Sequence, residues 1–138
     1  MRVAGFPPEG TELTRLLVVS DVERSKKWYM DVLGAELYRE YGGTSVVLKL
    51  LGSWLVLVTG GGETEDKPGT RYASPPDPST ISGQTIFGVP DFQAAYETLK
   101  ERGAEFLGPP GEYEWETRAF FRDPDGHLYE ISESKSTD

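Results

Sequence analysis

The fold is decided by residues 13–35, which read LTRLLVVSDVERSKKWYMDVLGA, and by their counterpart at residues 83–104, which reads GQTIFGVPDFQAAYETLKERGA. Each stretch is a run typical of a β-strand, then an aspartate, an amphipathic helical pattern and a Gly-Ala pair. Asp21 and Asp91 hold matching places and lie 70 residues apart. Each can cap the helix that follows, because its carboxylate accepts from free backbone N–H groups of the first turn. The sequence therefore predicts two similar modules.

Each predicted helix carries one apolar stripe and ends at a glycine. The stripes comprise Val22, Ser25, Trp28, Tyr29, Val32 and Leu33 in the first helix, and Phe92, Ala95, Tyr96 and Leu99 in the second. Gly34 and Gly103 are suited to end the helices, because glycine readily adopts the left-handed conformation. We expect Trp28 and Tyr29 to pack in the core, since both lie on the stripe.

Segments rich in strand-forming residues follow each helix, at residues 36–58 and 105–132, and turn-forming residues divide them. Each module is thus predicted to contain a strand, a helix and three further strands. Between the modules, residues 59–82 are rich in Gly, Pro, Ser and Asp and are too long for an ordinary connection, so we expect a linker or a lid. The expected organisation is one domain over residues 1–138, with modules at about 11–58 and 83–134.

Composition excludes several classes of function. The 138 residues include no cysteine, so disulfides, thiolate metal ligands and cysteine nucleophiles are excluded. With 23 acidic and 14 basic side chains the net charge is −9, which disfavours nucleic acids and anionic membranes as partners. No segment has the roughly 18 to 20 apolar residues of a membrane span, and no apolar signal core opens the chain. We expect a cytoplasmic protein.

Two motifs carry a resemblance to a known superfamily. Residues 20–34 read SDVERSKKWYMDVLG, and residues 120–130 read FFRDPDGHLYE. Together with the tandem modules they resemble the glyoxalase/bleomycin resistance protein/dioxygenase superfamily, also called vicinal oxygen chelate proteins, over about residues 11–134. The resemblance implies an α+β fold of tandem βαβββ modules, in which two curved mixed sheets form an incomplete barrel, usually within a homodimer.

The resemblance also indicates where a metal would be held in this superfamily. Metal-dependent members place ligands on the first and last strand of each module, which correspond here to Thr14, Val56, Gln84 and Glu130. Only Glu130 is a strong donor and Gln84 a weak one, whereas divalent transition metals favour imidazole and carboxylate ligands. We therefore expect no metal cofactor, with Gln84 and Glu130 as remnant positions. The only histidine, His127, is interpreted as an exposed turn residue.

The pairing expected between the last two strands also predicts a cavity that binds a small molecule. If the terminal hairpin pairs Phe120 with Glu130, then side chains of both its strands share one face. The predicted ligand-binding residues are Thr14, Trp54, Val56, Gln84, Arg118, Phe120, Leu128 and Glu130. Because a buried carboxylate needs a partner, we expect Arg118 to contact Glu130 and Gln84 to donate to it. The alternative is an ordinary sheet core with Arg118 and Glu130 paired.

An acidic segment before the last hairpin contains Tyr113 and Trp115, which could form a cation-accepting rim or simply a solvated loop. The leading functional hypothesis is a metal-independent small-molecule binding protein, similar to the drug-sequestering resistance proteins, that holds an aromatic or cationic ligand in a dimer cleft. The alternatives are a glyoxalase-type lyase or isomerase that uses Glu130 and Gln84, with Glu130 as the catalytic group, or an interaction module with a filled cavity. Extradiol dioxygenase activity is disfavoured, because Phe120 stands where those enzymes carry a tyrosine.

Overall fold

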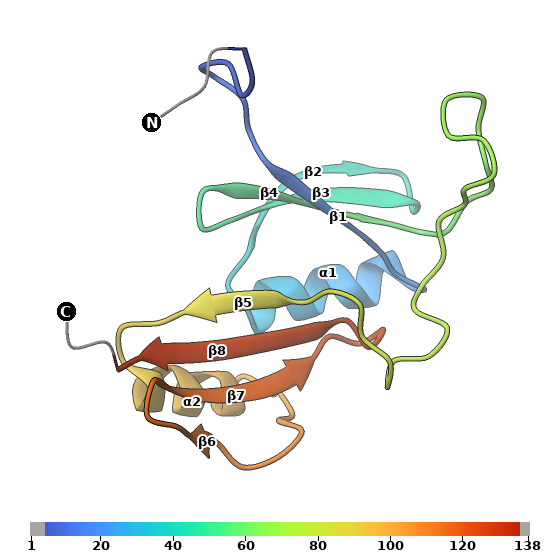
Figure 1. Ribbon diagram of the computed structural model, residues 1–138. Coiled ribbons are helices and arrows are strands. Elements are labelled where there is room, and N and C mark those ends of the chain that lie inside the picture. Colours follow the sequence, from blue (N-terminus) through green and yellow to red (C-terminus); the bar gives the residue numbers. More distant parts are fainter. Residues whose placement is uncertain (1–4, 136–138) are drawn as a thin grey trace.

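A computed structural model describes residues 5–135 of the chain and shows the predicted repeat (Figure 1). The first module contains β1 (Thr14–Val18), α1 (Val22–Asp31), β2 (Glu36–Tyr41), β3 (Ser45–Leu50) and β4 (Ser53–Val58). The second contains β5 (Thr85–Gly88), α2 (Phe92–Glu101), β6 (Gly111–Glu112), β7 (Glu116–Arg122) and β8 (Leu128–Ser134). The tandem βαβββ order is therefore confirmed, although β6 has only two residues.

Each module forms its own four-stranded mixed sheet. The strand orders are β1-β4-β3-β2 and β5-β8-β7-β6. In each sheet the first strand of the module runs parallel to the last, and the remaining pairs are antiparallel. The α+β class is confirmed, and the two sheets do not close into a barrel. Strands β1 and β5 each lie at a sheet edge, so each keeps one side without a strand partner in its own sheet.

Both helices begin and end as their sequences predict. The carboxylate of Asp21 accepts from the backbone N–H of Arg24, and that of Asp91 accepts from Ala94, both at 3.1 Å. Gly34 and Gly103 follow the helices with φ of +77° and +103°, the left-handed region that glycine enters without strain. Each helix has ten residues, and neither described helix is long and apolar enough to span a membrane.

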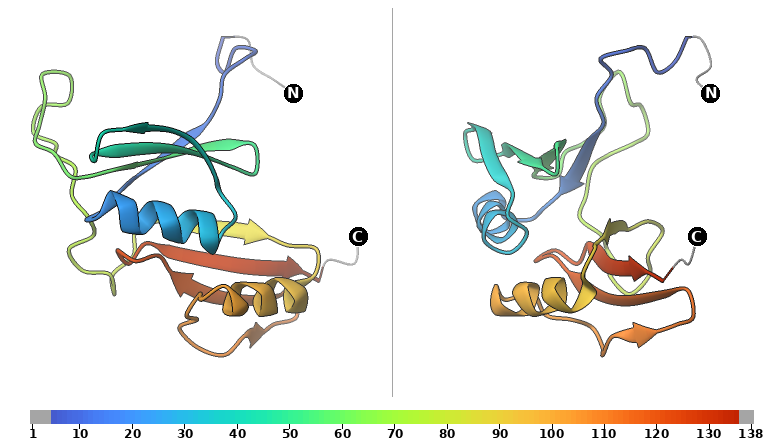
Figure 2. Two further views of the ribbon diagram at one scale, coloured as in Figure 1. Left: turned by 180° about the vertical axis from the view of Figure 1, so that it is seen from behind. Right: turned by 90° about the vertical axis from the view of Figure 1, so that its left-hand side faces the viewer.

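One continuous core joins the two modules. Seen from behind, α1 and α2 lie on the same side of the molecule (Figure 2). The core takes alternate residues from both sheets and the apolar stripes of both helices; its largest fully buried side chains are those of Tyr29, Phe121, Leu48, Leu57 and Ile131. Trp28 is partly buried against this core, as expected, and the centre of its ring lies 4.9 Å from the centre of the Tyr29 ring. The opposite face of each sheet remains open for a site.

A buried cluster of hydroxyl and carboxyl groups connects the modules. The Tyr29 hydroxyl on α1 donates to Oδ2 of Asp123 at 2.6 Å and lies 2.8 Å from the Tyr129 hydroxyl on β8. Oδ1 of Asp123 accepts from the backbone N–H groups of Asp125 and His127. Burial raises the pKa of Asp123 despite these hydrogen bonds. The cluster therefore fixes the turn between β7 and β8 against the first module.

The same turn reaches the end of β1. Asp125 accepts from the backbone N–H of Ser20 at 2.9 Å and forms an ion pair with Arg24 at 3.5 Å. The Nε2 atom of His127 lies 2.9 Å from the carbonyl oxygen of Val18 and must donate, because a carbonyl only accepts. His127 is therefore partly buried and bonded across the modules, so its interpretation as an exposed turn residue is wrong.

The connection over residues 59–82 leaves the body of the molecule and returns (Figure 1). Its outer part is closed by backbone hydrogen bonds between Gly61 and Tyr72. The returning part lies against the module junction, where the carbonyl of Pro78 accepts from Arg122 and the Ser74 hydroxyl donates to Val18. Whether it acts as a lid remains a prediction.

The hydroxyl cluster predicts a stability effect. Replacing Tyr29 by Phe keeps the ring but removes the group that bonds Asp123 and Tyr129, so the free energy of unfolding should fall by about 1 to 3 kcal/mol. Chemical denaturation would measure the change. The matched control is Tyr38→Phe. Because Tyr38 is 58% exposed, removing its hydroxyl should barely change the free energy of unfolding. Equal stability of Tyr29→Phe and the wild type would contradict a structural role for the cluster.

Candidate functional site

The open face of the second sheet collects the predicted residues of the last hairpin. Phe120 lies opposite Glu130, as expected, and Arg122 lies opposite Leu128. Ala119, Phe121, Tyr129 and Ile131 are buried in the core. Strand alternation therefore places Arg118, Phe120, Leu128 and Glu130 on the other face.

Glu130 is the most buried charged group of this face, with 4% of the residue exposed. Its Oε1 accepts from Nε2 of Gln84, just before β5, at 3.1 Å, so the predicted Gln84 contact is confirmed. Burial raises the pKa of Glu130, and nearby Glu116 raises it further, while Arg118 and Gln84 oppose the shift. Gln84 Oε1 is itself buried and has no hydrogen-bond partner among the described residues. This corner of the face thus holds a carboxylate and an unsatisfied amide acceptor.

Arg118 does not form the expected contact with Glu130. Its Nη1 pairs instead with Oε2 of Glu116 at 3.1 Å. The reason is the register: Arg118 lies opposite Ser132, and Glu116 is two residues away on the same face of the same strand. The prediction of an Arg118–Glu130 pair is therefore wrong, and within residues 5–135 the side-chain hydrogen-bond partner of the Glu130 carboxylate is the neutral amide of Gln84.

Aromatic rings surround the Arg118 guanidinium. It lies 4.7 Å from the centre of the Tyr113 ring and 5.3 Å from that of Phe120. Trp115 stacks on Tyr113 with ring centres 5.3 Å apart and is 63% exposed. The segment before β7 therefore presents two stacked rings beside the Arg118–Glu116 ion pair, a combination suited to flat, electron-poor or cationic groups.

The open face of the first sheet carries Thr14, Val56 and Trp54, which is partly buried. Thr14 pairs with Trp54 in the register of β1 and β4. The centre of the Trp54 ring lies 3.6 Å from Nζ of Lys49 and 4.8 Å from the centre of the Tyr38 ring. Sequence reasoning missed Lys49 and Tyr38, although strand alternation in β3 could have placed Lys49 on this face.

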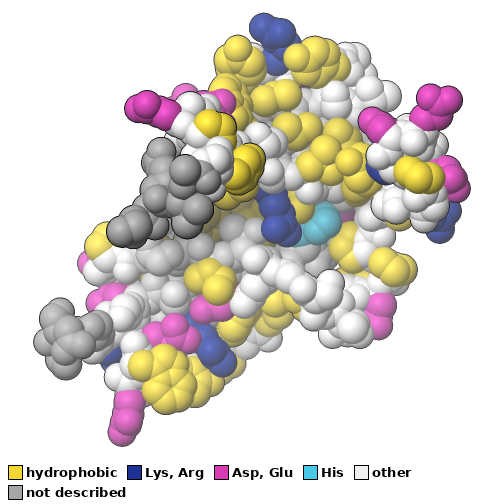
Figure 3. Space-filling model, turned by 45° about the horizontal axis from the view of Figure 1, so that its top comes forward, with side chains coloured by type: hydrophobic (Ala, Val, Ile, Leu, Met, Phe, Trp, Pro, Cys, Tyr) yellow, Lys and Arg dark blue, Asp and Glu magenta, His cyan; other side chains and the backbone are white. Residues whose placement is uncertain are grey.

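A groove between the modules brings parts of both faces together. It has a volume of about 410 Å³, and Trp54 and Gln84 both line it. From above, hydrophobic side chains cover much of the first module, whereas acidic groups lie mainly toward the edges of this view (Figure 3). Phe120, Leu128 and Glu130 do not line this groove. The predicted site is therefore divided between two sheet faces that meet only at the groove.

Comparison with known proteins settles the family. The family model described as "Glyoxalase/Bleomycin resistance protein/Dioxygenase superfamily" matches residues 12–131. The chain belongs to this superfamily. A lactoylglutathione lyase from Haemophilus influenzae is 29% identical over 143 aligned residues, covering 91% of this chain and 93% of that protein.

Two solved structures show the same fold. A glyoxalase/bleomycin resistance protein/dioxygenase from Alicyclobacillus acidocaldarius has a TM-score of 0.71 at 18% identity, covering 94% of this chain and 96% of that one. TnmS3, an antibiotic binding protein from Streptomyces sp. CB03234, has a TM-score of 0.63 at 22% identity, covering 91% of this chain and 97% of that one. The relatives and the chains of the same fold thus include a protein named as an enzyme and a protein named for binding an antibiotic.

The donor set does not fit the metal centre found in some members of the superfamily. Of the four corresponding positions, Thr14 and Val56 lie on the first sheet, whereas Gln84 and Glu130 lie at the second. Val56 has no donor atom, and Thr14 is a weak ligand. Residues 5–135 contain no group of three or more His, Cys, Asp or Glu side chains placed to hold an ion. One carboxylate and one amide give too few ligands for a transition metal.

Metal affinity can be measured directly. After dialysis against a chelator and exposure to zinc, nickel, iron or manganese, the protein should retain no stoichiometric metal, because Glu130 is the only strong donor of the four positions. Elemental analysis measures the content, and Glu130→Gln serves as the matched control for nonspecific binding. One ion per chain that disappears in Glu130→Gln would show that the donor set is sufficient after all.

Proposed function

We propose that the protein binds a small aromatic cation on the Glu130 face, without a metal, and that a second copy of the chain completes the cleft. The observation that carries this proposal is the state of Glu130. It is a buried carboxylate that forms no ion pair with a described residue, because Arg118, the cation that acts on its pKa, is paired with Glu116. A buried charge without a cationic partner is costly, so a ligand cation would find a favourable place there.

The surroundings of Glu130 suit an aromatic ligand. Phe120 shares its face, and the stacked pair of Tyr113 and Trp115 lies beside Arg118 on the same side of the sheet. The free acceptor of Gln84 could receive an N–H group of the same ligand. Rings supply most of the contact area in such sites, and a few polar groups orient the ligand. The antibiotic-binding function named for TnmS3 supports this reading for a chain of the same fold.

The open faces also support a dimer. Leu16 on β1 is 38% exposed and Ile86 on β5 is 54% exposed. A second copy could cover these apolar residues and bring the Trp54 face of one chain over the Glu130 face of the other. Isologous pairing of this kind is the commonest form of assembly.

Glu130→Gln tests the ligand proposal, with proflavine, a planar aromatic cation, as the probe. The variant keeps the shape but loses the charge, so binding should weaken by about 1 to 3 kcal/mol. Fluorescence titration would measure it, with Glu101→Gln on the exposed face of α2 as the control. Undiminished affinity of Glu130→Gln would refute the proposal.

The affinity for proflavine should depend on pH with a definite sign. Because the folded-state pKa of Glu130 is raised above 4.5, the free site holds a proton at a higher pH than an exposed glutamate. A cation binds the ionised form, so wild-type affinity should rise as the pH rises through that raised pKa. Glu130→Gln should show no such rise.

The predicted dimer can be tested separately from ligand binding. At tens of micromolar, light scattering should give twice the chain mass, because a monomer would leave the apolar residues of β1 and β5 in water. A Leu16→Glu variant should shift the mass toward that of one chain. A monomeric wild type would show that the cleft does not span two chains.

A lyase or isomerase of the glyoxalase type is the second candidate, favoured by the relatives named as lactoylglutathione lyases. A raised pKa suits Glu130 to act as a general base beside a carbonyl, with the Gln84 amide as its neighbour. Lactoylglutathione lyase activity in the purified protein, lost in Glu130→Gln but kept in Glu101→Gln, would favour this candidate over simple binding.

A further inference from the structure

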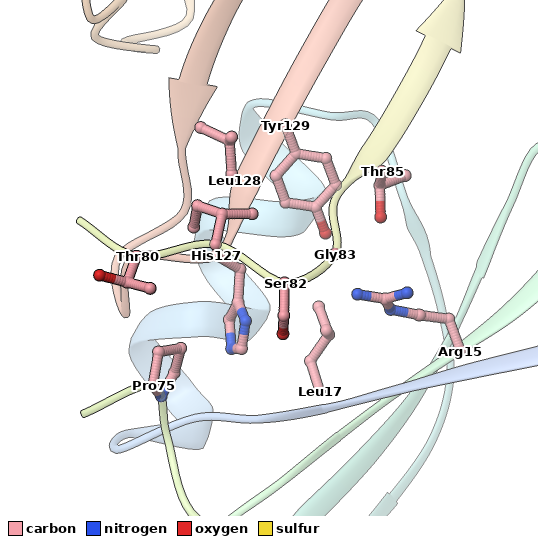
Figure 4. A pocket seen from close by; sticks show the side chains of 12 residues that line it. Arg15, Leu17, Pro75, Thr80, Ser82, Gly83, Thr85, His127, Leu128 and Tyr129 are labelled. Carbon is pink, nitrogen blue, oxygen red and sulfur yellow. The ribbon is translucent and has the colours of Figure 1, made fainter. Parts of the chain in front are cut away.

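Arg15 lies where two cavities meet between the free edges of β1 and β5. One cavity has a volume of about 220 Å³ and the other is the 410 Å³ groove described above. Arg15, Thr85 and Tyr129 line both, so the two cavities adjoin at these residues, and the pair is called the channel below. In the close view of the smaller cavity, the guanidinium of Arg15 points toward Ser82, Gly83 and Thr85 (Figure 4).

The channel has a polar end and an apolar end. Around the smaller cavity, Thr80, Ser82 and Thr85 contribute hydroxyl groups. The larger cavity is mainly apolar, and its hydrophobic lining includes Leu13, Leu50, Leu51, Leu55, Ile86 and Phe87. No aspartate or glutamate lines either cavity, although the chain has 23 acidic side chains. An anion in either cavity therefore meets no carboxylate in the lining itself, although Glu12 and Glu130 accept from the lining residues Trp54 and Gln84.

Arg15 is a cation without a direct partner in the described part of the chain. It forms no hydrogen bond or ion pair with another described residue. Arg15 is exposed, and strand alternation places its side chain on the same side of β1 as the buried Leu17. By contrast, Arg118 and Arg24 each pair with a carboxylate. An arginine on this side of a strand, facing hydroxyl groups and an apolar groove, has the chemistry to bind a carboxylate through two parallel N–H bonds.

We propose that this channel binds a medium-chain carboxylate, with its head on Arg15 and the hydroxyls of Ser82 and Thr85 and its tail in the apolar groove. The proposal does not depend on the Glu130 site, which selects the opposite charge. The two sites approach each other through Gln84, which lines the groove and donates to Glu130. The chain would then carry an anion site and a cation site on either side of β5.

Octanoate is the probe for this proposal, followed by calorimetry and by amide shifts in NMR spectra of the full chain. Wild-type protein should bind it saturably, with shifts at Arg15, Thr85 and Phe87. Arg15→Gln should weaken binding by about tenfold or more, because it removes the charged guanidinium that can make two parallel hydrogen bonds to a carboxylate. Arg71→Gln removes the same charge from the exposed connecting segment and should change nothing.

Two further measurements keep the result interpretable. Octanol has the same tail without the charge and should bind at least about tenfold more weakly than octanoate. Arg15→Lys keeps the charge without the fork and should bind more tightly than Arg15→Gln, while thermal unfolding shows that all variants are folded. The proposal is overturned if octanoate shows no saturable binding, or if Arg15→Gln binds it as well as Arg71→Gln does.

Discussion

The hydrogen bonds of the Tyr29 hydroxyl with Asp123 and Tyr129 are the constraint on which the rest of the structure depends. They join α1 of the first module to the β7–β8 turn and to β8 of the second, in a core where none of these groups can turn to water. The backbone bonds of the same turn extend the junction to the end of β1. Since both helix-covered faces are used in this shared core, the opposite faces of both sheets remain available for a ligand.

The modules and their caps could be read from the sequence because they depend on local chemistry. Asp21 and Asp91 cap the helices through backbone groups three residues away, and strand alternation alone gives the face shared by Phe120 and Glu130. The Gln84–Glu130 contact followed from the correspondence of the two modules. These features need no knowledge of how distant parts of the chain meet.

Two predictions were wrong: the pairing of Arg118 with Glu130 and the exposure of His127. Both depend on which partner a side chain meets in the folded chain. Arg118 had two carboxylates within reach of its long side chain, and it pairs with Glu116 on its own strand, where little ordering is needed. His127 bonds to Val18, which lies 109 residues away, so no local pattern could show it. Arg15 could have been noticed from the sequence, because strand alternation places this charged residue on the same side of β1 as Leu17. Its significance depends on the channel, which residues from both modules form.

Glu130 and Arg15 carry opposite charges on the two sides of β5, and we propose that the first binds a cation and the second an anion. The proposal for Glu130 depends on its being a buried carboxylate whose missing partner is the ligand. The most direct test is the pKa of the Glu130 carboxyl, measured by carbon-13 NMR in the free protein and with bound proflavine. We predict a pKa above 4.5 in the free protein, which falls when the cation binds. An ordinary pKa that proflavine leaves unchanged would contradict the account.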